Sequence, residues 1–206
     1  MKSNKNINGA ESLVRTLVFN KVDVCFTNPG TSEMHFVAAL DKVPGIKCVL
    51  GLFEGVLTGA ADGYYRMLKK PASTLLHLGP GLANGLANLH NAKKANSGIV
   101  NIIGQHTYKH LELESPLTSD IEAIAKPMSH WVKTSKSSLQ IASDGAKAIE
   151  IAQKAPGKIA SLILPADTAW GIGGKIVKAK TPKPRSAIDK DKIIKIAKIL
   201  HNGKKS

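Results

Sequence analysis

The stretch that decides the fold is Cys48–Ala61, CVLGLFEGVLTGAA, in which an apolar run is followed by small residues around one carboxylate. This pattern predicts a strand followed by a helix that begins at Glu54. A carboxylate that is buried without a partner costs several kcal/mol, so Glu54 needs either a hydrogen-bond partner or a function. The helix dipole also favours a carboxylate at a helix start, and the spacing alone leaves both explanations open.

Strands and helices alternate on both sides of this stretch. Helical apolar spacing is found over residues 10–20, 32–40, 54–68, 82–95, 120–125 and 137–155. Short apolar runs predict strands over residues 22–26, 46–50, 73–78, 99–103 and 159–164. Such alternation across short loops is typical of parallel βαβ units. We therefore predict an α/β fold with a doubly wound, mostly parallel sheet flanked by helices.

Three other segments share the pattern of a strand that runs into a Gly- or Pro-containing loop. They are Asn28-Pro29-Gly30-Thr31, Gly79-Pro80-Gly81-Leu82-Ala83-Asn84 and Gly104-Gln105. Together with Glu54, they closely resemble the N-terminal, pyrimidine-binding domain of thiamine-diphosphate enzymes of the acetolactate synthase and benzoylformate decarboxylase group. The resemblance covers residues 8–170 and rests on the order and spacing of the four segments.

The resemblance implies a role for each segment. Thiamine diphosphate becomes a nucleophile when its thiazolium C2 loses a proton to its own 4′-imino group, a tautomer promoted by a carboxylic acid at the pyrimidine N1′. By resemblance, Glu54 is that acid, and the remaining cofactor contacts come from Asn28, Pro29, Gly30, Thr31, Asn84 and Gln105. Gly30 would let the backbone approach the pyrimidine without a Cβ. An ordinary strand-to-helix turn is the alternative explanation for residues 28–31.

His77 follows the apolar residues of a predicted strand. Strand ends of α/β sheets bind ligands, and imidazole suits proton transfer near neutral pH. Benzoylformate decarboxylase-like sequences resemble this chain in carrying a His just before the Gly-rich turn, where it moves protons around the substrate carbonyl. Acetolactate synthases more often have a small hydroxyl residue there. The resemblance thus implies a catalytic His77 and favours a 2-oxo-acid decarboxylase, with a structural histidine as the alternative.

The diphosphate half of the cofactor site is not found in this sequence. In the resembling family, a Gly-Asp-Gly sequence and a later Asn in another domain hold the metal and the diphosphate. Ala61-Asp62-Gly63 and Ser143-Asp144-Gly145 do not sit at a strand end with a suitably spaced Asn, so we predict no metal site here. The resemblance implies thiamine diphosphate as cofactor, with Mg²⁺ held by a domain outside this chain. A flavin is left open, and nothing in the sequence indicates one.

The end of the chain differs in composition from the rest. Residues 1–170 are predicted to form the pyrimidine-binding domain, and residues 171–187, rich in Gly, Lys and Pro, a linker. Residues 188–206 are predicted to be a terminal helix or the start of a truncated central domain. Their apolar face comprises Ile193, Ile196, Ala197 and Leu200.

Composition narrows the classes of function. The chain has 206 residues, 43% of them hydrophobic, and a net charge of +14. Residues 171–206 carry +9 of this charge and residues 1–170 carry +5, and aromatic residues make up only 4%. We therefore expect no nucleic-acid partner. No apolar run approaches the roughly 20 residues that span a bilayer, and Met1–Asn6 is polar, unlike a signal peptide. We expect a cytoplasmic protein without a membrane partner.

Weaker signals are explained without a further site. Cys25 and Cys48 lie in apolar runs, where a free thiol behaves as a small apolar group. A loop with two histidines, one tyrosine and two glutamates lacks metal-ligand spacing and is expected to be solvated; these residues are His106, Tyr108, His110, Glu112 and Glu114. The resemblance places this loop near the substrate, with contacts from Gln105 and His106.

The most specific hypothesis is the pyrimidine-binding half of a thiamine-diphosphate-dependent 2-oxo-acid decarboxylase or carboligase. We expect the isolated chain to be inactive without a diphosphate-binding domain from another chain or from missing sequence. A homo- or hetero-oligomer and a small 2-oxo-acid substrate are also expected. The alternatives are a non-catalytic assembly or regulatory module of the same fold, and a nucleotide-binding Rossmann domain. The Rossmann pattern requires Gly or Ala where Asn84 stands and an acidic residue further on.

Overall fold

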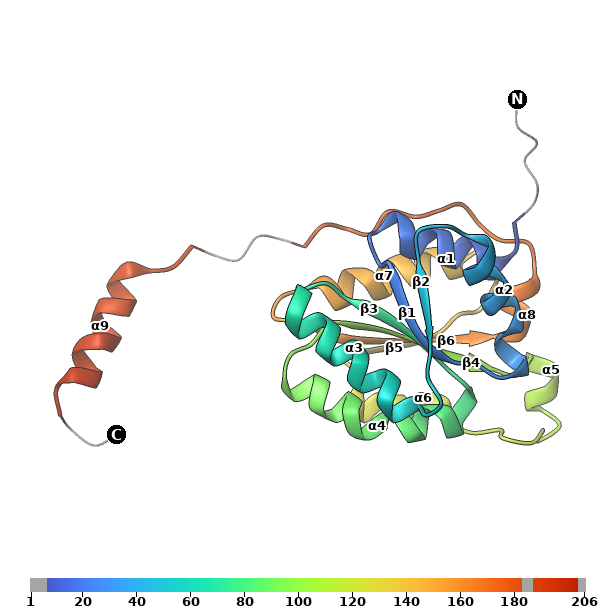
Figure 1. The fold of residues 1–206 in the computed structure, drawn as a ribbon, viewed down its shortest axis with the longest axis horizontal. Helices are drawn as coiled ribbons and strands as arrows, with labels where there is room; N and C mark the ends of the chain where they lie inside the picture. The colour runs from blue at the N-terminus through green and yellow to red at the C-terminus, as the bar shows by residue number, and fades with distance from the viewer. Residues whose placement is uncertain (1–6, 183–186, 204–206) are drawn as a thin grey trace, which may run out of the picture.

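A computed structural model describes residues 7–182 and 187–203, and its centre is one six-stranded parallel sheet (Figure 1). In spatial order the strands are β2 (Lys47–Leu50), β1 (Val24–Asn28), β3 (Ala72–Leu76), β4 (Ile99–Gln105), β6 (Ile159–Pro165) and β5 (Trp131–Thr134). Every pair of neighbouring strands is parallel. The predicted doubly wound sheet is confirmed.

Helices cover both faces of the sheet (Figure 1). One face packs against α1 (Gly9–Phe19), α2 (Met34–Lys42), α7 (Ile141–Gln153) and α8 (Ala166–Trp170). The other packs against α3 (Glu54–Leu68), α4 (Leu78–Lys94) and α6 (Ile121–Ala125). The shorter elements are η1 (Thr31–Glu33), α5 (Tyr108–Leu111) and η2 (Lys126–Met128), and α9 (Lys190–His201) lies beyond residues 183–186.

The central strands explain why the fold is well specified. All residues of β3, β4 and β6 are buried, as expected for parallel strands covered on both faces. Leu75 and Ile102 belong to the apolar cluster on one face. Leu76 and Ile103 belong to the cluster on the other face. A shift of one residue in strand register would exchange these faces, so the two clusters together fix the register.

Several elements differ from the sequence prediction. No strand was predicted at β5, a four-residue edge strand whose residues are all half-buried, nor a helix at α8. Helix α4 begins at Leu78 rather than near residue 82, because a proline in the first helical turn loses no hydrogen bond. Cys25 is buried as expected, whereas Cys48 is exposed, since β2 lies at the edge of the sheet.

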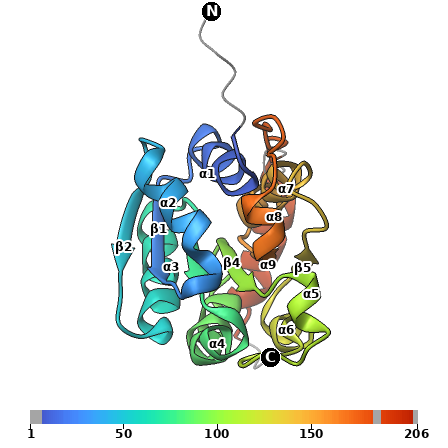
Figure 2. The same cartoon turned by 90° about the vertical axis from the view of Figure 1, so that its right-hand side faces the viewer.

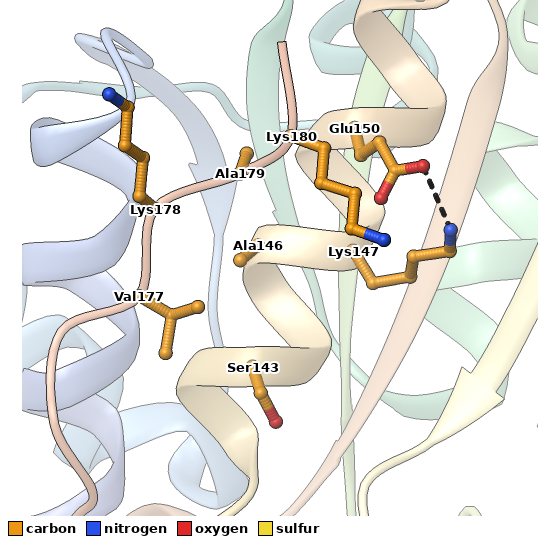
Figure 3. A pocket seen from close by; sticks show the side chains of 8 residues that line it. All are labelled: Ser143, Ala146, Lys147, Glu150, Val177, Lys178, Ala179 and Lys180. Carbon is orange, nitrogen blue, oxygen red and sulfur yellow. Dashed lines mark hydrogen bonds and ion pairs between the residues drawn. The ribbon is translucent and has the colours of Figure 1, made fainter.

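The first part of the predicted linker is attached to the folded domain. Gly173 donates its backbone N–H to Ile7, and the side chain of Asn20 hydrogen-bonds the backbone of Val177 and Ala179. Figure 3 shows residues 177–180 beside the outer face of α7, where Lys147 and Glu150 form an ion pair. Within the described residues, this segment therefore covers part of α1 and α7.

Helix α9 is formed as predicted, and its described residues are all exposed. The division of the chain at residues 170 and 187 stays a prediction. Residues 1–6 of the predicted domain, 183–186 of the linker and 204–206 of the tail lie outside the described residues. Among the helices that the structure describes, none combines the length and the apolar character needed to cross a membrane.

Two helix glycines give a matched test of how tightly α3 and α4 pack. A Cβ on Gly85 of α4 would lie 2.9 Å from Cγ2 of Thr58 on α3, whereas a Cβ on Gly63 of α3 would meet no atom within 4 Å. Thr58 is buried and also hydrogen-bonds the carbonyl of Gly85 at 3.0 Å. We expect Gly85→Ala to lower the free energy of unfolding by about 1–3 kcal/mol through overpacking. Gly63→Ala should raise it by about 0.5–1 kcal/mol.

Urea unfolding of the 206-residue chain measures both changes. Equal stabilisation by the two substitutions would show that α3 and α4 have room between them at Gly85.

Candidate functional site

The residues predicted to bind the cofactor come from four segments that meet at the end of the sheet where the carboxyl ends of the strands lie. Asn28 is the last residue of β1, Glu54 the first of α3, and Gln105 the last of β4; His77 joins β3 to α4. In a parallel sheet these carboxyl ends share one edge, which is where open α/β sheets bind ligands. Figure 2 views the molecule from the side on which α2, α5 and α8 lie.

Glu54 is buried, with 7% of its surface exposed, and two amide side chains hold it. Nδ2 of Asn28 donates to Oε1 at 3.1 Å, and Nδ2 of Asn84 donates to Oε2 at 3.0 Å. The start of α3 adds a favourable dipole. These donors offset the cost of burying the carboxyl. Among the described residues Glu54 has no cationic partner, so the amides orient the group without neutralising it.

Gly81 and two exposed apolar residues lie close to Glu54 in space or in the chain. A Cβ on Gly81 would lie 3.2 Å from Oε1 of Glu54 and 3.4 Å from Cβ of His77, so the glycine leaves room beside both side chains. Leu52 and Phe53, which precede Glu54 in the chain, are 94% and 50% exposed.

His77 is paired with Glu33, a residue that sequence reasoning missed. Nδ1 of His77 lies 2.7 Å from Oε2 of Glu33, and the backbone N–H of Gly30 donates to the same oxygen at 2.7 Å. Glu33 is completely buried. Burial raises the pKa of its carboxyl, while the Gly30 N–H and His77 act in the opposite direction. The one sequence signal was the three-residue spacing from Gly30 to Glu33, which is that of a capping box.

Two glycines make room for this pair. A Cβ on Gly30 would overlap the imidazole of His77, and a Cβ on Gly104 would overlap Oε1 of Glu33. The close approach at Gly30 is therefore made by His77. A contact between Gly30 and a pyrimidine stays a prediction.

The backbone is strained at the first residue of α4, next to His77. Leu78 has a φ of +52°, a left-handed conformation that bulky residues rarely adopt. Its side chain is fully buried, and the N–H of Gly81 donates to the carbonyl of His77 at 2.8 Å. Packing and this hydrogen bond hold the turn. Strain of this kind is concentrated at functional sites.

The remaining predicted residues are not joined to Glu54 by hydrogen bonds. Pro29 is half-buried, and Thr31 is exposed at the start of η1. Gln105 is buried, and its Oε1 accepts the backbone N–H of His106 at 2.8 Å. The structure therefore brings Asn28, Glu54 and Asn84 together, and it places Gln105 against its own loop.

The loop after β4 is fixed by local contacts. Nε2 of His106 lies 2.9 Å from the carbonyl of Pro116, and its ring packs edge-on against His110. Tyr108 donates its hydroxyl to the carbonyl of Ser135 at 2.8 Å. Within residues 7–182 and 187–203, no group of three or more His, Cys, Asp and Glu side chains could hold a metal ion.

The contact between Gly30 and His77 predicts a measurable energetic coupling. Gly30 has an ordinary extended backbone, φ −114° and ψ −164°, and the atoms nearest to an alanine Cβ there would be those of the imidazole. We expect Gly30→Ala to lower the free energy of unfolding by about 1–3 kcal/mol. In a His77→Ala background most of this loss should disappear. A double-mutant cycle from urea unfolding measures the coupling, and an equal loss in both backgrounds would contradict the contact.

Comparison with known proteins agrees with this geometry. The sequence model described as "Thiamine pyrophosphate enzyme, N-terminal TPP binding domain" matches residues 7–129. The proposed acetolactate synthase large subunit IlvX of Mycobacterium tuberculosis is 49% identical to this chain over 197 residues. Benzoylformate decarboxylase of Pseudomonas aeruginosa is 30% identical over 143 residues. These matches cover 96% and 69% of this chain, which spans only 38% and 27% of the two relatives.

Solved structures share the fold. The structure of a proposed thiamin diphosphate-dependent enzyme from Mycobacterium smegmatis has a TM-score of 0.85 at 22% identity, over 96% of this chain and 38% of that one. The thiamine diphosphate-dependent 4-hydroxybenzoylformate decarboxylase of Rhodococcus jostii RHA1 has a TM-score of 0.81 at 21% identity, over 94% and 37%. With the family match over more than half of the chain, these findings show that it belongs to the N-terminal, cofactor-binding domain family of thiamine pyrophosphate enzymes.

Proposed function

We propose that this chain binds the aminopyrimidine half of thiamine diphosphate as part of a 2-oxo-acid decarboxylase or carboligase, with Glu54 as the residue that acts on the pyrimidine. The observation that carries the proposal is the geometry of Glu54. Its buried carboxyl lies at the carboxyl edge of the sheet, and Asn28 and Asn84 each hold one of its oxygens.

The hydrogen-bonding chemistry of the residues present fits a heteroaromatic ring with polar substituents. Gly81 keeps a Cβ away from Oε1 of Glu54, and Leu52 and Phe53, the two residues before Glu54, are exposed and apolar. A carboxyl can accept a hydrogen bond from a ring substituent or, when protonated, donate one to a ring nitrogen. These are the groups that an aminopyrimidine presents. We assign the pyrimidine contacts to Asn28, Pro29, Gly30 and Thr31 of one loop, and to Asn84 and Gln105.

Each of the chain's own groups has a defined task in this proposal. When bound, thiamine diphosphate would supply a nucleophilic carbon for reaction with a 2-oxo acid. Glu54 holds a proton at the pyrimidine N1′, and the amides of Asn28 and Asn84 keep its carboxyl from rotating. His77 moves a proton at the substrate carbonyl. The presence of His77 favours a decarboxylase over a carboligase. Both activities remain in the proposal, because one relative is named as an acetolactate synthase subunit and another as a decarboxylase.

The diphosphate and Mg²⁺ are assigned to another domain. The chain spans 38% of its relative from Mycobacterium tuberculosis, which leaves most of that relative's length for other domains. We therefore propose that the isolated 206-residue chain is inactive, and that activity requires a diphosphate-binding domain in an oligomer or a longer chain. The identity of the 2-oxo acid, a flavin and a cytoplasmic location stay predictions.

Glu54→Gln in the complete enzyme tests the main assignment. We expect turnover to fall by at least about 100-fold, because Gln has nearly the same volume but supplies no acidic proton. Folding should be retained, since one Asn amide can rotate to face the new donor. Glu150→Gln on α7 is the control and should leave turnover near the wild-type value. If turnover of Glu54→Gln falls by less than about fivefold, Glu54 is only a helix-start acid, and a non-catalytic module is favoured.

His77→Ala tests the decarboxylase assignment. We expect turnover of 2-oxo acids to fall more than the affinity for thiamine diphosphate, because the imidazole acts on the substrate rather than on the pyrimidine. His90→Ala, at an exposed position of the adjoining helix α4, is the control. His77→Gln keeps an N–H donor for Glu33 and separates loss of the imidazole from loss of stability. Near-normal turnover in both His77 variants would make the residue structural.

A further inference from the structure

The buried Glu33 has no role in the chemistry described so far. Its Oε2 receives the N–H of Gly30 at 2.7 Å and lies 2.7 Å from Nδ1 of His77. Its Oε1 is buried without a hydrogen-bond partner among the described residues. A buried polar atom that is left unsatisfied destabilises the fold, so the arrangement has a stability cost.

We propose that Glu33 is a positioning residue that holds His77 in the tautomer with its proton on Nδ1, so that Nε2 presents a free lone pair. Neutral imidazole has one N–H and one acceptor nitrogen, and the partner of one nitrogen decides the state of the other. Oε2 of Glu33 already accepts the Gly30 N–H. Nδ1–H of His77 is then the second donor to the same oxygen.

The assignment is made for the ionised carboxylate of Glu33, which can only accept hydrogen bonds. Its Oε2 then accepts from both Gly30 and His77, so Nδ1 of His77 carries a proton. A neutral Glu33 with its proton on Oε2 would instead donate to Nδ1 while still accepting the N–H of Gly30, and the proton of His77 would then be on Nε2. The two cases therefore predict opposite tautomers of His77.

The surrounding backbone prevents His77 from leaving this position. The imidazole lies against Gly30, where no Cβ could fit. The positive φ of Leu78 and the hydrogen bond from Gly81 to the carbonyl of His77 fix the backbone at the other end of the side chain. The absence of a side chain at Gly104 leaves room for the Glu33 carboxyl. Nε2 of His77 makes no hydrogen bond with any described residue, and the side chain keeps 24% of its surface exposed.

The consequence for chemistry rests on the proposed function. With the proton on Nδ1, Nε2 can accept a proton from a substrate group, as a general base must. With the proton on Nε2, the exposed nitrogen would be only a donor. Glu33 would thus determine what His77 can do without touching the substrate itself.

Nuclear magnetic resonance of the 206-residue chain, labelled with ¹⁵N in histidine, tests the tautomer directly. Two-bond ¹H–¹⁵N correlations distinguish protonated from unprotonated ring nitrogens. The spectrum is recorded at about pH 8, where an ordinary histidine is neutral. The signals of His77 are those that His77→Ala removes. We expect Nδ1 to be protonated and Nε2 unprotonated. An Nε2–H tautomer in the wild-type chain would overturn the proposal, whether or not any variant folds.

Two variants separate the acceptor from the shape of the side chain. Glu33→Met keeps an unbranched chain of similar size and removes the acceptor, so His77 should shift to the Nε2–H tautomer. Glu33→Gln should retain the Nδ1–H tautomer, because the Gly30 N–H selects the carbonyl end of the amide. An unchanged tautomer in Glu33→Met would overturn the proposal.

Kinetics of the complete enzyme add a second readout. Glu33→Met should lower turnover by about 100-fold, the range of a lost general base, and Glu33→Gln by less. If the tautomer shifts as expected while His77→Ala keeps normal turnover, the positioning role stands and the catalytic role of His77 fails. If the tautomer does not shift but His77→Ala is impaired, the reverse conclusion holds.

Discussion

The parallel direction of all six strands is the constraint on which the site depends. Asn28, His77 and Gln105 are separated by up to 77 residues in the chain, and they meet because β1, β3 and β4 end at the same edge. The completely buried strands β3 and β4 give this edge a rigid support. Sites built on such element ends are more accurately held than sites on long loops.

Two carboxyl groups at this end of the sheet, those of Glu54 and Glu33, lie in different environments. Glu54 accepts a hydrogen bond at each oxygen, and the two residues before it in the chain are exposed and apolar. Glu33 is completely buried and uses one oxygen for two partners, so it acts on the protein itself. Opposite environments for two acids in one site are a common way to divide chemical roles between them.

The sequence predicted the sheet, most helices and the start of α3 at Glu54, because these depend on local periodicity and composition. It also predicted that Asn28 and Asn84 belong with Glu54, through the resemblance to a known family. Glu33 was missed because its partners, Gly30 apart, are distant in the chain and meet only after folding. The start of α4 was misplaced because Gly79-Pro80-Gly81 has loop composition, although Pro is compatible with a first helical turn.

The fit of Glu33 between two glycines has a consequence for how this part of the sequence can evolve. A side chain larger than hydrogen at position 104 leaves no space for the Glu33 carboxyl, and one at position 30 displaces the imidazole of His77. Once a descendant loses the histidine, the glutamate keeps its burial cost and loses its partner. A substitution at position 30, 33, 77 or 104 therefore changes the space or the partner of the other three, and we expect these four positions to change together.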